Sequence, residues 1–141
     1  MAQLISRGAE AQPLVEVRGR GADGSATRMV ILAGHFDVTT DTTGSPARVA
    51  GTLRFLVPTA PSLPSTLDPS TLRASVTVHP SGVSPIVQSD IRVRVVSARA
   101  LFVPDAGGGI TLAVESALET LYLASHTARF AYQVVATVPD V

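Results

Sequence analysis

The sequence predicts an α+β fold in one domain, 1–141, with strands and loops over 1–104 and mainly helical structure over 105–141. Three observations predict it: clean period-two alternation in segments before residue 104, a Gly-rich break at 105–109, and apolar residues at helical spacing after that break. The chain has 141 residues, 45% of them hydrophobic, which suffices for one core. It has no cysteine, which excludes disulfides, a thiol nucleophile and thiolate metal sites.

The first strands are short apolar runs separated by turns. Residues 14–18 and 28–38 form two such runs, with a Gly-rich turn at 19–24 between them and a polar turn at 39–46 after them. Residues 58–65 contain three prolines, which remove backbone donors and fix φ, so we expect an exposed connection there.

Three later segments alternate strictly between apolar and polar residues. They are 49–57, 72–79 and 90–96, the last of which can continue to Val103, and a turn at 79–82 follows the second. Such alternation is typical of an antiparallel sheet with one packed face and one open face.

The segment 110–125 is predicted to be an amphipathic helix. Its apolar residues recur every three or four positions, and Glu115 and Glu119 lie together on the opposite, solvated side. A strand over 110–114 stays open, because Ile110, Leu112 and Val114 also alternate.

The last segment, 127–138, is ambiguous in the same way. Ala128, Phe130 and Tyr132 alternate, whereas Phe130, Val134 and Val138 make a helical stripe. We favour a second helix, or a helix with an extended tail, and the fold of 127–141 stays open.

The sequence offers little for catalysis, so we expect no enzyme and no cofactor. No Gly-x-Ser-x-Gly elbow is present. His35 and Asp37 would share a face of a strand and form half a metal site, but ordinary surface residues are the better interpretation, and we expect no bound metal. The run 107–109 has neither the Lys nor the Ser/Thr of a phosphate-binding P-loop, which favours a plain lead-in to a helix. No apolar run reaches the roughly 20 residues that span a bilayer, so no membrane partner is expected.

One constellation of residues suggests a binding surface. All cationic side chains are arginine, and residues 1–104 carry a net charge of +3 while 105–141 carry −3. If the apolar faces of 49–57, 72–79 and 90–96 pack together, the opposite faces form one surface on which arginines and hydroxyls can bind phosphates. The alternative is that the open face of any one-sided sheet must be polar. The candidate RNA-binding residues are Arg54, Arg73, Ser75, Thr77, Arg92 and Arg94.

The layout resembles the coat proteins of single-stranded RNA bacteriophages, the levivirus-like family. Residues 1–4 and 11–15 are similar to the family's opening, 72–78 and 90–95 to its last two strands, and 100–104 to the apolar stretch before its first helix. The segment 110–125 takes the place of that helix. The resemblance covers nearly the full chain, as an order of elements and not as a specific motif.

The resemblance implies a fold and a function. It implies an N-terminal β-hairpin and a five-stranded antiparallel sheet followed by one or two C-terminal helices, in an interlocked homodimer whose helices cross over the partner. Such dimers assemble into an icosahedral shell and hold single-stranded RNA, in some members a genomic hairpin, against the inner sheet face. The loops 19–24, 39–46 and 58–70 would then join dimers. The expected location is the virion, assembled in the bacterial cytoplasm.

Two other functions remain open. One is a decoration or tail structural protein of a DNA phage, which would bind a preformed shell. The other is a β-rich module that binds a small molecule or glycan, although the chain offers only four Phe, two Tyr and no Trp to line a pocket.

Overall fold

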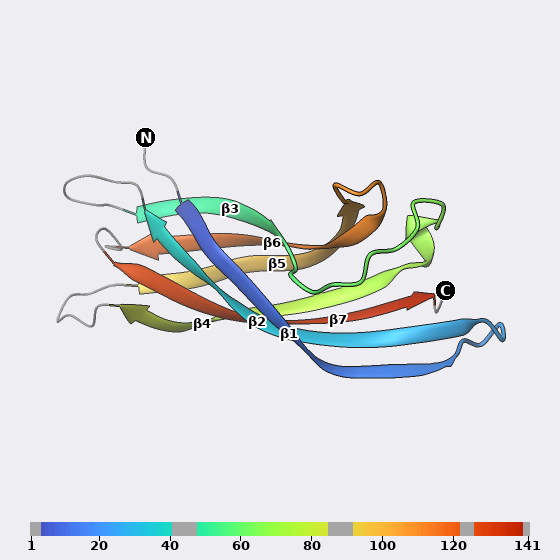
Figure 1. Cartoon of the computed structure of the whole chain (residues 1–141). Helices are drawn as coiled ribbons and strands as arrows, with labels where there is room; N and C mark the ends of the chain where they lie inside the picture. Colours follow the sequence, from blue (N-terminus) through green and yellow to red (C-terminus); the bar gives the residue numbers. More distant parts are fainter. Residues whose placement is uncertain (1–3, 41–47, 85–91, 122–125, 140–141) are drawn as a thin grey trace.

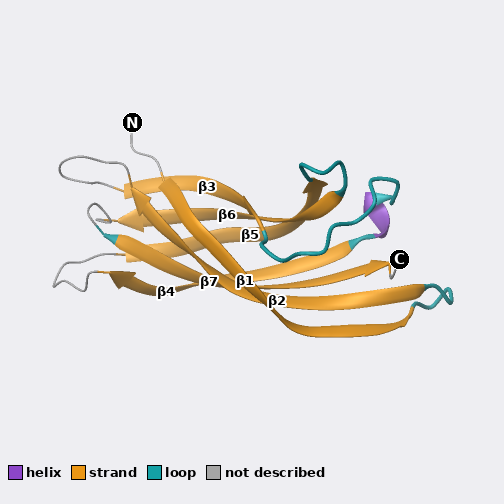
Figure 2. Ribbon diagram, viewed as in Figure 1, coloured by secondary structure: helices purple, strands orange, loops and turns teal. Residues whose placement is uncertain are grey.

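Strands dominate the part of the chain that the computed structural model describes, residues 4–40, 48–84, 92–121 and 126–139 (Figures 1 and 2). The elements in order are β1 (Leu4–Arg20), β2 (Ala26–Thr40), β3 (Arg48–Leu56), the 3-10 helix η1 (Pro69–Thr71), β4 (Arg73–Ser84), β5 (Arg92–Pro104), β6 (Ile110–Leu121) and β7 (Thr127–Pro139). No helix in these ranges is long and apolar enough to cross a membrane.

The strands form two antiparallel sheets that pack face to face. One sheet has the order β1-β2-β7-β4 and the other the order β3-β6-β5. The pairs β2–β7 and β3–β6 are nested in the sequence, and the edge strands β4 and β5 approach each other between the sheets. Six strands are thus wound in the nested order found in jelly rolls, and β1 adds a further strand at one edge (Figure 1).

The predicted α+β fold is wrong, because the described residues contain no α-helix. Residues 110–121, predicted as a helix, form β6, the central strand of the three-stranded sheet. Since β6 has a neighbour on both sides, even outward residues such as Thr111 and Ala113 are buried. The inward face also includes the buried polar residues Ser116 and Thr120, and the outward face includes the apolar residues Ala117 and Leu121. These residues interrupt the two-residue period in the sequence and leave three- and four-residue spacings that resemble a helix. Residues 122–125 lie outside the described part of the chain.

The second predicted helix is also a strand. β7 lies between β2 and β4, and its even-numbered residues from Ala128 to Val138 are buried while Arg129, Gln133 and Thr137 are exposed. The alternation at 128–134 was therefore the correct signal, and the helical stripe was incidental. The interlocked dimer implied by the resemblance relies on these helices, so it has no basis in the described residues.

The alternation predicted for 49–57, 72–79 and 90–96 is confirmed over the described strand residues.

The predicted turns and connections differ from the structure. The turn predicted at 79–82 is instead a bulge between Pro80 and Gly82, inside an edge strand that tolerates proline. The Pro-rich connection is not simply exposed, because Leu63 is 3% exposed and bridges Ile110. The turn predicted at 39–46 falls mostly on residues that are not described.

The core lies between the sheets and includes residues of both. Phe36 of β2 stacks on Phe130 of β7, with ring centroids 5.3 Å apart. Across the interface it meets Phe55 of β3 at 4.9 Å, and Phe55 meets Tyr132 of β7 at 5.2 Å. This aromatic cluster joins the sheets, so their outer faces are held at a fixed place on opposite sides of the core.

Candidate functional site

The outer face of the β3–β6–β5 sheet carries most of the charge in its strands. We call it the arginine face, and its charged residues in the described part of the chain are Arg48, Arg54, Arg92, Arg94, Arg99, Glu115 and Glu119. The formal sum of these side chains is +3. The side chains of the arginines that pair with these glutamates are 53–65% exposed, whereas the side chains of both glutamates are 21% exposed. These arginines are Arg48, Arg54, Arg94 and Arg99.

Strand alternation places these residues on one face. On β3 the inward residues Val49, Leu53 and Phe55 leave the even positions facing outward. On β5 a bulge between Val95 and Ser97 changes the parity, so that Arg94 and Arg99 both face outward. The arginines of the two edge strands therefore flank the glutamates of the central strand.

Glu119 binds two arginines from opposite neighbours. Its Oε2 atom accepts hydrogen bonds from Arg48 Nη2 of β3 at 2.7 Å and from Arg94 Nη2 of β5 at 3.2 Å. The hydrogen bond from Arg48 is the main cause that lowers the pKa of Glu119, and the same contact raises the pKa of Arg48. All three groups are charged at neutral pH.

Glu115 repeats the arrangement one step along the sheet. Arg99 of β5 donates from Nε to Oε1 at 2.8 Å, and its Nη2 atom lies 2.6 Å from the same oxygen. Arg54 of β3 donates from Nη2 to Oε2 at 3.1 Å. The contact with Arg99 is the largest cause of the lowered pKa of Glu115. Each glutamate thus orients two guanidinium groups and leaves an excess of positive charge.

The two clusters lie beside two shallow hollows on this face. The first, which we call the arginine hollow, measures about 370 Å³, and its lining is Arg48, Arg92, Arg94, Glu119, Thr120 and Leu121. The second measures about 200 Å³ and has Arg99 and Glu115 as its only charged lining residues. Glu115 and Glu119 are four residues apart, or about 13 Å along an extended strand.

The structure brings together half of the predicted RNA-binding residues. Arg54, Arg92 and Arg94 lie on the arginine face. The other three are exposed on the outer face of the four-stranded sheet, because β4 pairs with β7 and not with β3 or β5. These are Arg73, Ser75 and Thr77. The prediction of one shared face for all six residues is therefore wrong.

Sequence reasoning missed four residues of the arginine face. Arg48 has the same parity as Arg54, and a strand that begins one residue earlier includes it. Arg99 is hidden by the bulge in β5, which no local pattern announces. Glu115 and Glu119 were assigned to a solvated helical side, yet they lie between the arginines, because residues four apart share a face on a strand as well as on a helix. The expected acidic helical side does not exist in the described residues.

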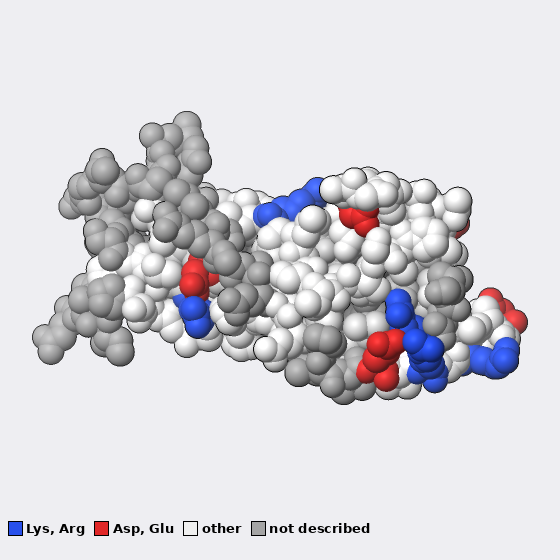
Figure 3. Space-filling view, in the orientation of Figure 1, with Lys and Arg blue, Asp and Glu red and all other residues white. Residues whose placement is uncertain are grey.

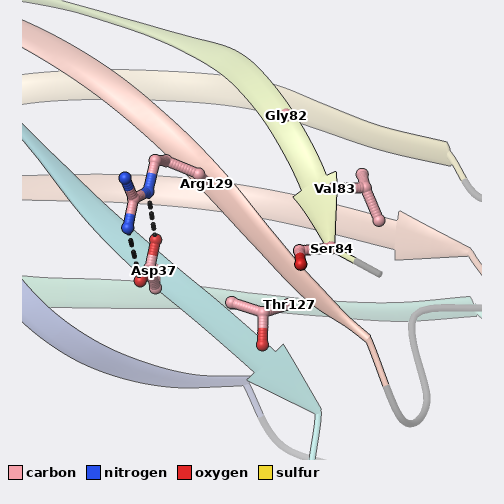
Figure 4. A pocket seen from close by; sticks show the side chains of 6 residues that line it. All are labelled: Asp37, Gly82, Val83, Ser84, Thr127 and Arg129. Carbon is pink, nitrogen blue, oxygen red and sulfur yellow. Dashed lines mark hydrogen bonds and ion pairs between the residues drawn. The ribbon is translucent and has the colours of Figure 1, made fainter. Parts of the chain in front are cut away.

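A third hollow lies at the end of the four-stranded sheet where β2, β7 and β4 meet (Figure 4). It measures about 530 Å³, and its lining includes Asp37 of β2 and Arg129 of β7, which are joined by a double hydrogen bond. The Nε–Oδ1 distance is 2.8 Å and the Nη2–Oδ2 distance 3.2 Å. The hydrogen bond from Arg129 is the main cause that lowers the pKa of Asp37, so the carboxylate is ionised and paired with the guanidinium.

The pairing of Asp37 with Arg129 affects the half of a metal site that His35 and Asp37 were considered to form. They share the outer face of β2, as their spacing predicted, but Asp37 faces Arg129. In the described ranges no three His, Cys, Asp or Glu side chains are grouped to hold a metal.

Elsewhere the charges are scattered. On the side of the molecule shown in Figure 3, charged residues form small groups, mostly with both signs adjacent, separated by uncharged surface. Glu16 of β1 also has two arginines, Arg18 and Arg28, at 3.5 Å. The arginine face differs because it holds two such clusters, with shorter contacts, and the further arginine Arg92 on three adjacent strands.

Comparison with protein-family models found no matching family, and comparisons with curated proteins and with solved structures found no match. The geometry defines a β-sandwich with a cationic sheet face.

Proposed function

We propose that this protein is a self-associating structural protein of a ribonucleoprotein particle, a coat protein that packages single-stranded RNA on its arginine face. The observation that carries the proposal is the set of five arginines around two glutamates on one open sheet face. Phosphate contacts by arginine are strong and independent of base sequence, as packaging requires. The proposal does not rest on the resemblance to RNA-phage coat proteins, whose helices are missing from the described residues.

The face suits a single strand that lies across it. Between the two clusters runs a row of small residues, Thr52, Ala117 and Ser97, on three adjacent strands. The separation of about 13 Å between the clusters exceeds the distance between neighbouring phosphates, so one strand meets both clusters with an unclamped nucleotide in between.

Self-association has support in the sheet edges. β1 is a 17-residue strand at the end of its sheet, and β3 and β5 are the edges of the other sheet. Exposed edges pair with further chains unless they are protected. Two register irregularities in β1 and Pro13 on this strand limit such pairing without removing it. Leu56 of β3 and Val96 of β5 are apolar and more than half exposed, and they add contact surface on these edge strands.

The test is the state of the recombinant full chain. Size-exclusion chromatography with light scattering, recorded at 260 and 280 nm, separates an RNA-filled particle from a small species. With no Trp and two Tyr the protein absorbs weakly at 280 nm, so packaged RNA dominates the trace. We expect a large particle rich in absorbance at 260 nm. A small species without nucleic acid overturns the proposal and favours a decoration protein or a binding module.

A charge-matched pair of variants tests the face itself. Arg92→Ala with Arg94→Ala removes two cations from the arginine face, whereas Arg18→Ala with Arg73→Ala removes two from the four-stranded sheet. We expect only the first variant to lose RNA, and its log affinity against log salt to flatten by about 1.4, at roughly 0.7 per phosphate contact. Equal RNA content in both variants refutes the assignment of the face.

A further inference from the structure

We propose that the arginine hollow binds a terminal phosphate group, the dianionic phosphate at the end of a nucleic-acid strand or on a free nucleotide. This inference rests on the proposed function, since it assigns a ligand to one end of the arginine face. The hollow differs from the rest of the face in its number of guanidinium groups and in its charge.

Three strands supply the lining of the hollow. Arg48 of β3 and Arg92 of β5 both lie opposite Leu121 of β6 in the sheet register, one on each side. Arg94 lies one row further along, opposite Glu119. The guanidinium groups of Arg48 and Arg94 meet at Glu119 Oε2, and Arg92 lines the same hollow, so a group seated in it is next to three arginine side chains. The cavity of about 370 Å³ has room for a phosphate and part of the attached sugar.

Glu119 prepares two of these arginines for a ligand. Its Oε2 atom accepts one hydrogen bond from Arg48 and one from Arg94. A guanidinium has five N–H donors in a planar fork, so each of these arginines retains donors for phosphate oxygens. Glu119 is a positioning residue, because it holds the forks in place and lowers the entropic cost of binding.

The charge of the hollow favours a terminal phosphate over an internal one. Its lining residues carry three formal positive charges and one negative charge, a sum of +2. The second hollow is lined by one arginine and one glutamate, a sum of zero. An internal phosphodiester carries a single negative charge, whereas a terminal phosphate carries about −1.5 to −2 at pH 7. The arginine hollow is matched to the second of these groups.

The experiment compares three RNA oligomers of one sequence, with a 5′-phosphate, a 3′-phosphate or no terminal phosphate. Fluorescence anisotropy with the full chain measures their affinities. We expect at least one phosphorylated oligomer to bind about tenfold more tightly than the unphosphorylated one, because of the additional charge in the hollow. If all three bind equally, the inference is wrong while the proposed function stands; if none binds, the proposed function fails.

Two variants locate the effect. Arg48→Ala removes one fork of the hollow, and we expect it to abolish the preference for the terminal phosphate. Arg54→Ala removes an equally charged residue from the other cluster, and it should weaken all three oligomers by the same factor and leave their ratio unchanged. A preference that survives Arg48→Ala contradicts the location. Adenosine 5′-monophosphate as competitor separates the two sources, since full competition by the nucleotide assigns the hollow to nucleotides and weak competition to strand ends.

Discussion

At the scale of single residues, the chemistry of this protein depends on which partners a side chain meets across strands. Glu115 and Glu119 have lowered pKa values because arginines from both neighbouring strands donate hydrogen bonds to them. Asp37 has a lowered pKa for the same reason, through Arg129. None of these contacts is visible in local sequence, because the partners are 16 to 92 residues apart along the chain.

Tyr132 is the residue with the largest resolved pKa change. Its side chain is 2% exposed, and burial raises its pKa from 10 to about 12. A folded pKa above the unfolded one means that the stabilisation by the neutral phenol is complete below pH 10 and is lost as pH rises from 10 to 12. We therefore expect the free energy of unfolding to fall by on the order of 2 kcal/mol across this range.

Two variants test this expectation. Tyr122→Phe leaves Tyr132 as the only tyrosine, so the ultraviolet absorbance of phenolate reports its titration directly. Urea unfolding at several pH values measures the stability, and Tyr132→Phe should flatten its decline above pH 10. Titration of Tyr132 near its ordinary value of 10 contradicts the burial of this ring.

At the scale of elements, the alternation within a strand could be predicted and the partners of that strand could not. The outward positions of β3, β4 and β5 follow from the sequence. The sheet to which each strand belongs does not, because it depends on contacts such as Arg54 with Glu115, 61 residues away. Arg73 was therefore placed on the wrong face although its orientation on β4 was predicted correctly.

Central strands were the hardest elements to predict. β6 is paired at both edges and packs one face against the core, while its composition of Ala, Leu and Glu favours a helix locally. Tertiary pairing overrides that preference. The Gly-rich run was taken as a lead-in to a helix, but it forms the β5–β6 turn. A Cβ at Gly109 would lie 2.5 Å from the carbonyl oxygen of Leu63, which explains the glycine there.

Neutralising the two glutamates of the arginine face should strengthen its binding of RNA. Glu115→Gln with Glu119→Gln raises the formal charge of the face from +3 to +5 while the amide oxygens still accept hydrogen bonds. We expect single-stranded RNA to bind roughly three- to tenfold more tightly at low salt, with the difference shrinking as salt increases. Glu16→Gln on β1 is the matched control for the single variant Glu119→Gln, because Glu16 is also paired with two arginines, Arg18 and Arg28. It should leave the affinity unchanged.

The same two glutamates should make the stability of the protein and its RNA affinity depend on pH. Because the folded pKa values of both glutamates lie below 4.5, their ion pairs contribute stability above pH 4.5 and lose it as pH falls through the lowered values. Protonation also removes negative charge from the face, so the RNA affinity of the wild type should rise as pH falls below 4.5. The double variant should lack that rise. An unchanged or lower affinity of the double variant at neutral pH argues against phosphate binding at this face.

At the scale of the whole molecule, the two sheets depend on one core. The aromatic cluster includes Phe36 and Tyr132 of the four-stranded sheet and Phe55 of the three-stranded sheet. β2 and β7 pair residues about 100 positions apart, such as Val38 with Ala128, so neither sheet is complete until distant parts of the chain meet. We therefore expect the sandwich to unfold as one cooperative unit.

A double-mutant cycle measures this coupling between the sheets. Phe36→Leu and Phe55→Leu each truncate one ring of a pair whose centroids are 4.9 Å apart. Each change should lower the free energy of unfolding by about 1 kcal/mol. We expect a coupling energy of about 0.5–1.5 kcal/mol between them, because a contact between two aromatic rings stabilises more than the burial of their surface alone. Leu56 lies next to Phe55 in sequence but points outward and is 53% exposed, so Leu56→Ala should be nearly neutral and additive with Phe36→Leu. Urea unfolding of the single and double variants gives all these values. Additive effects of Phe36→Leu and Phe55→Leu would contradict a stabilising contact between these two rings across the sheets.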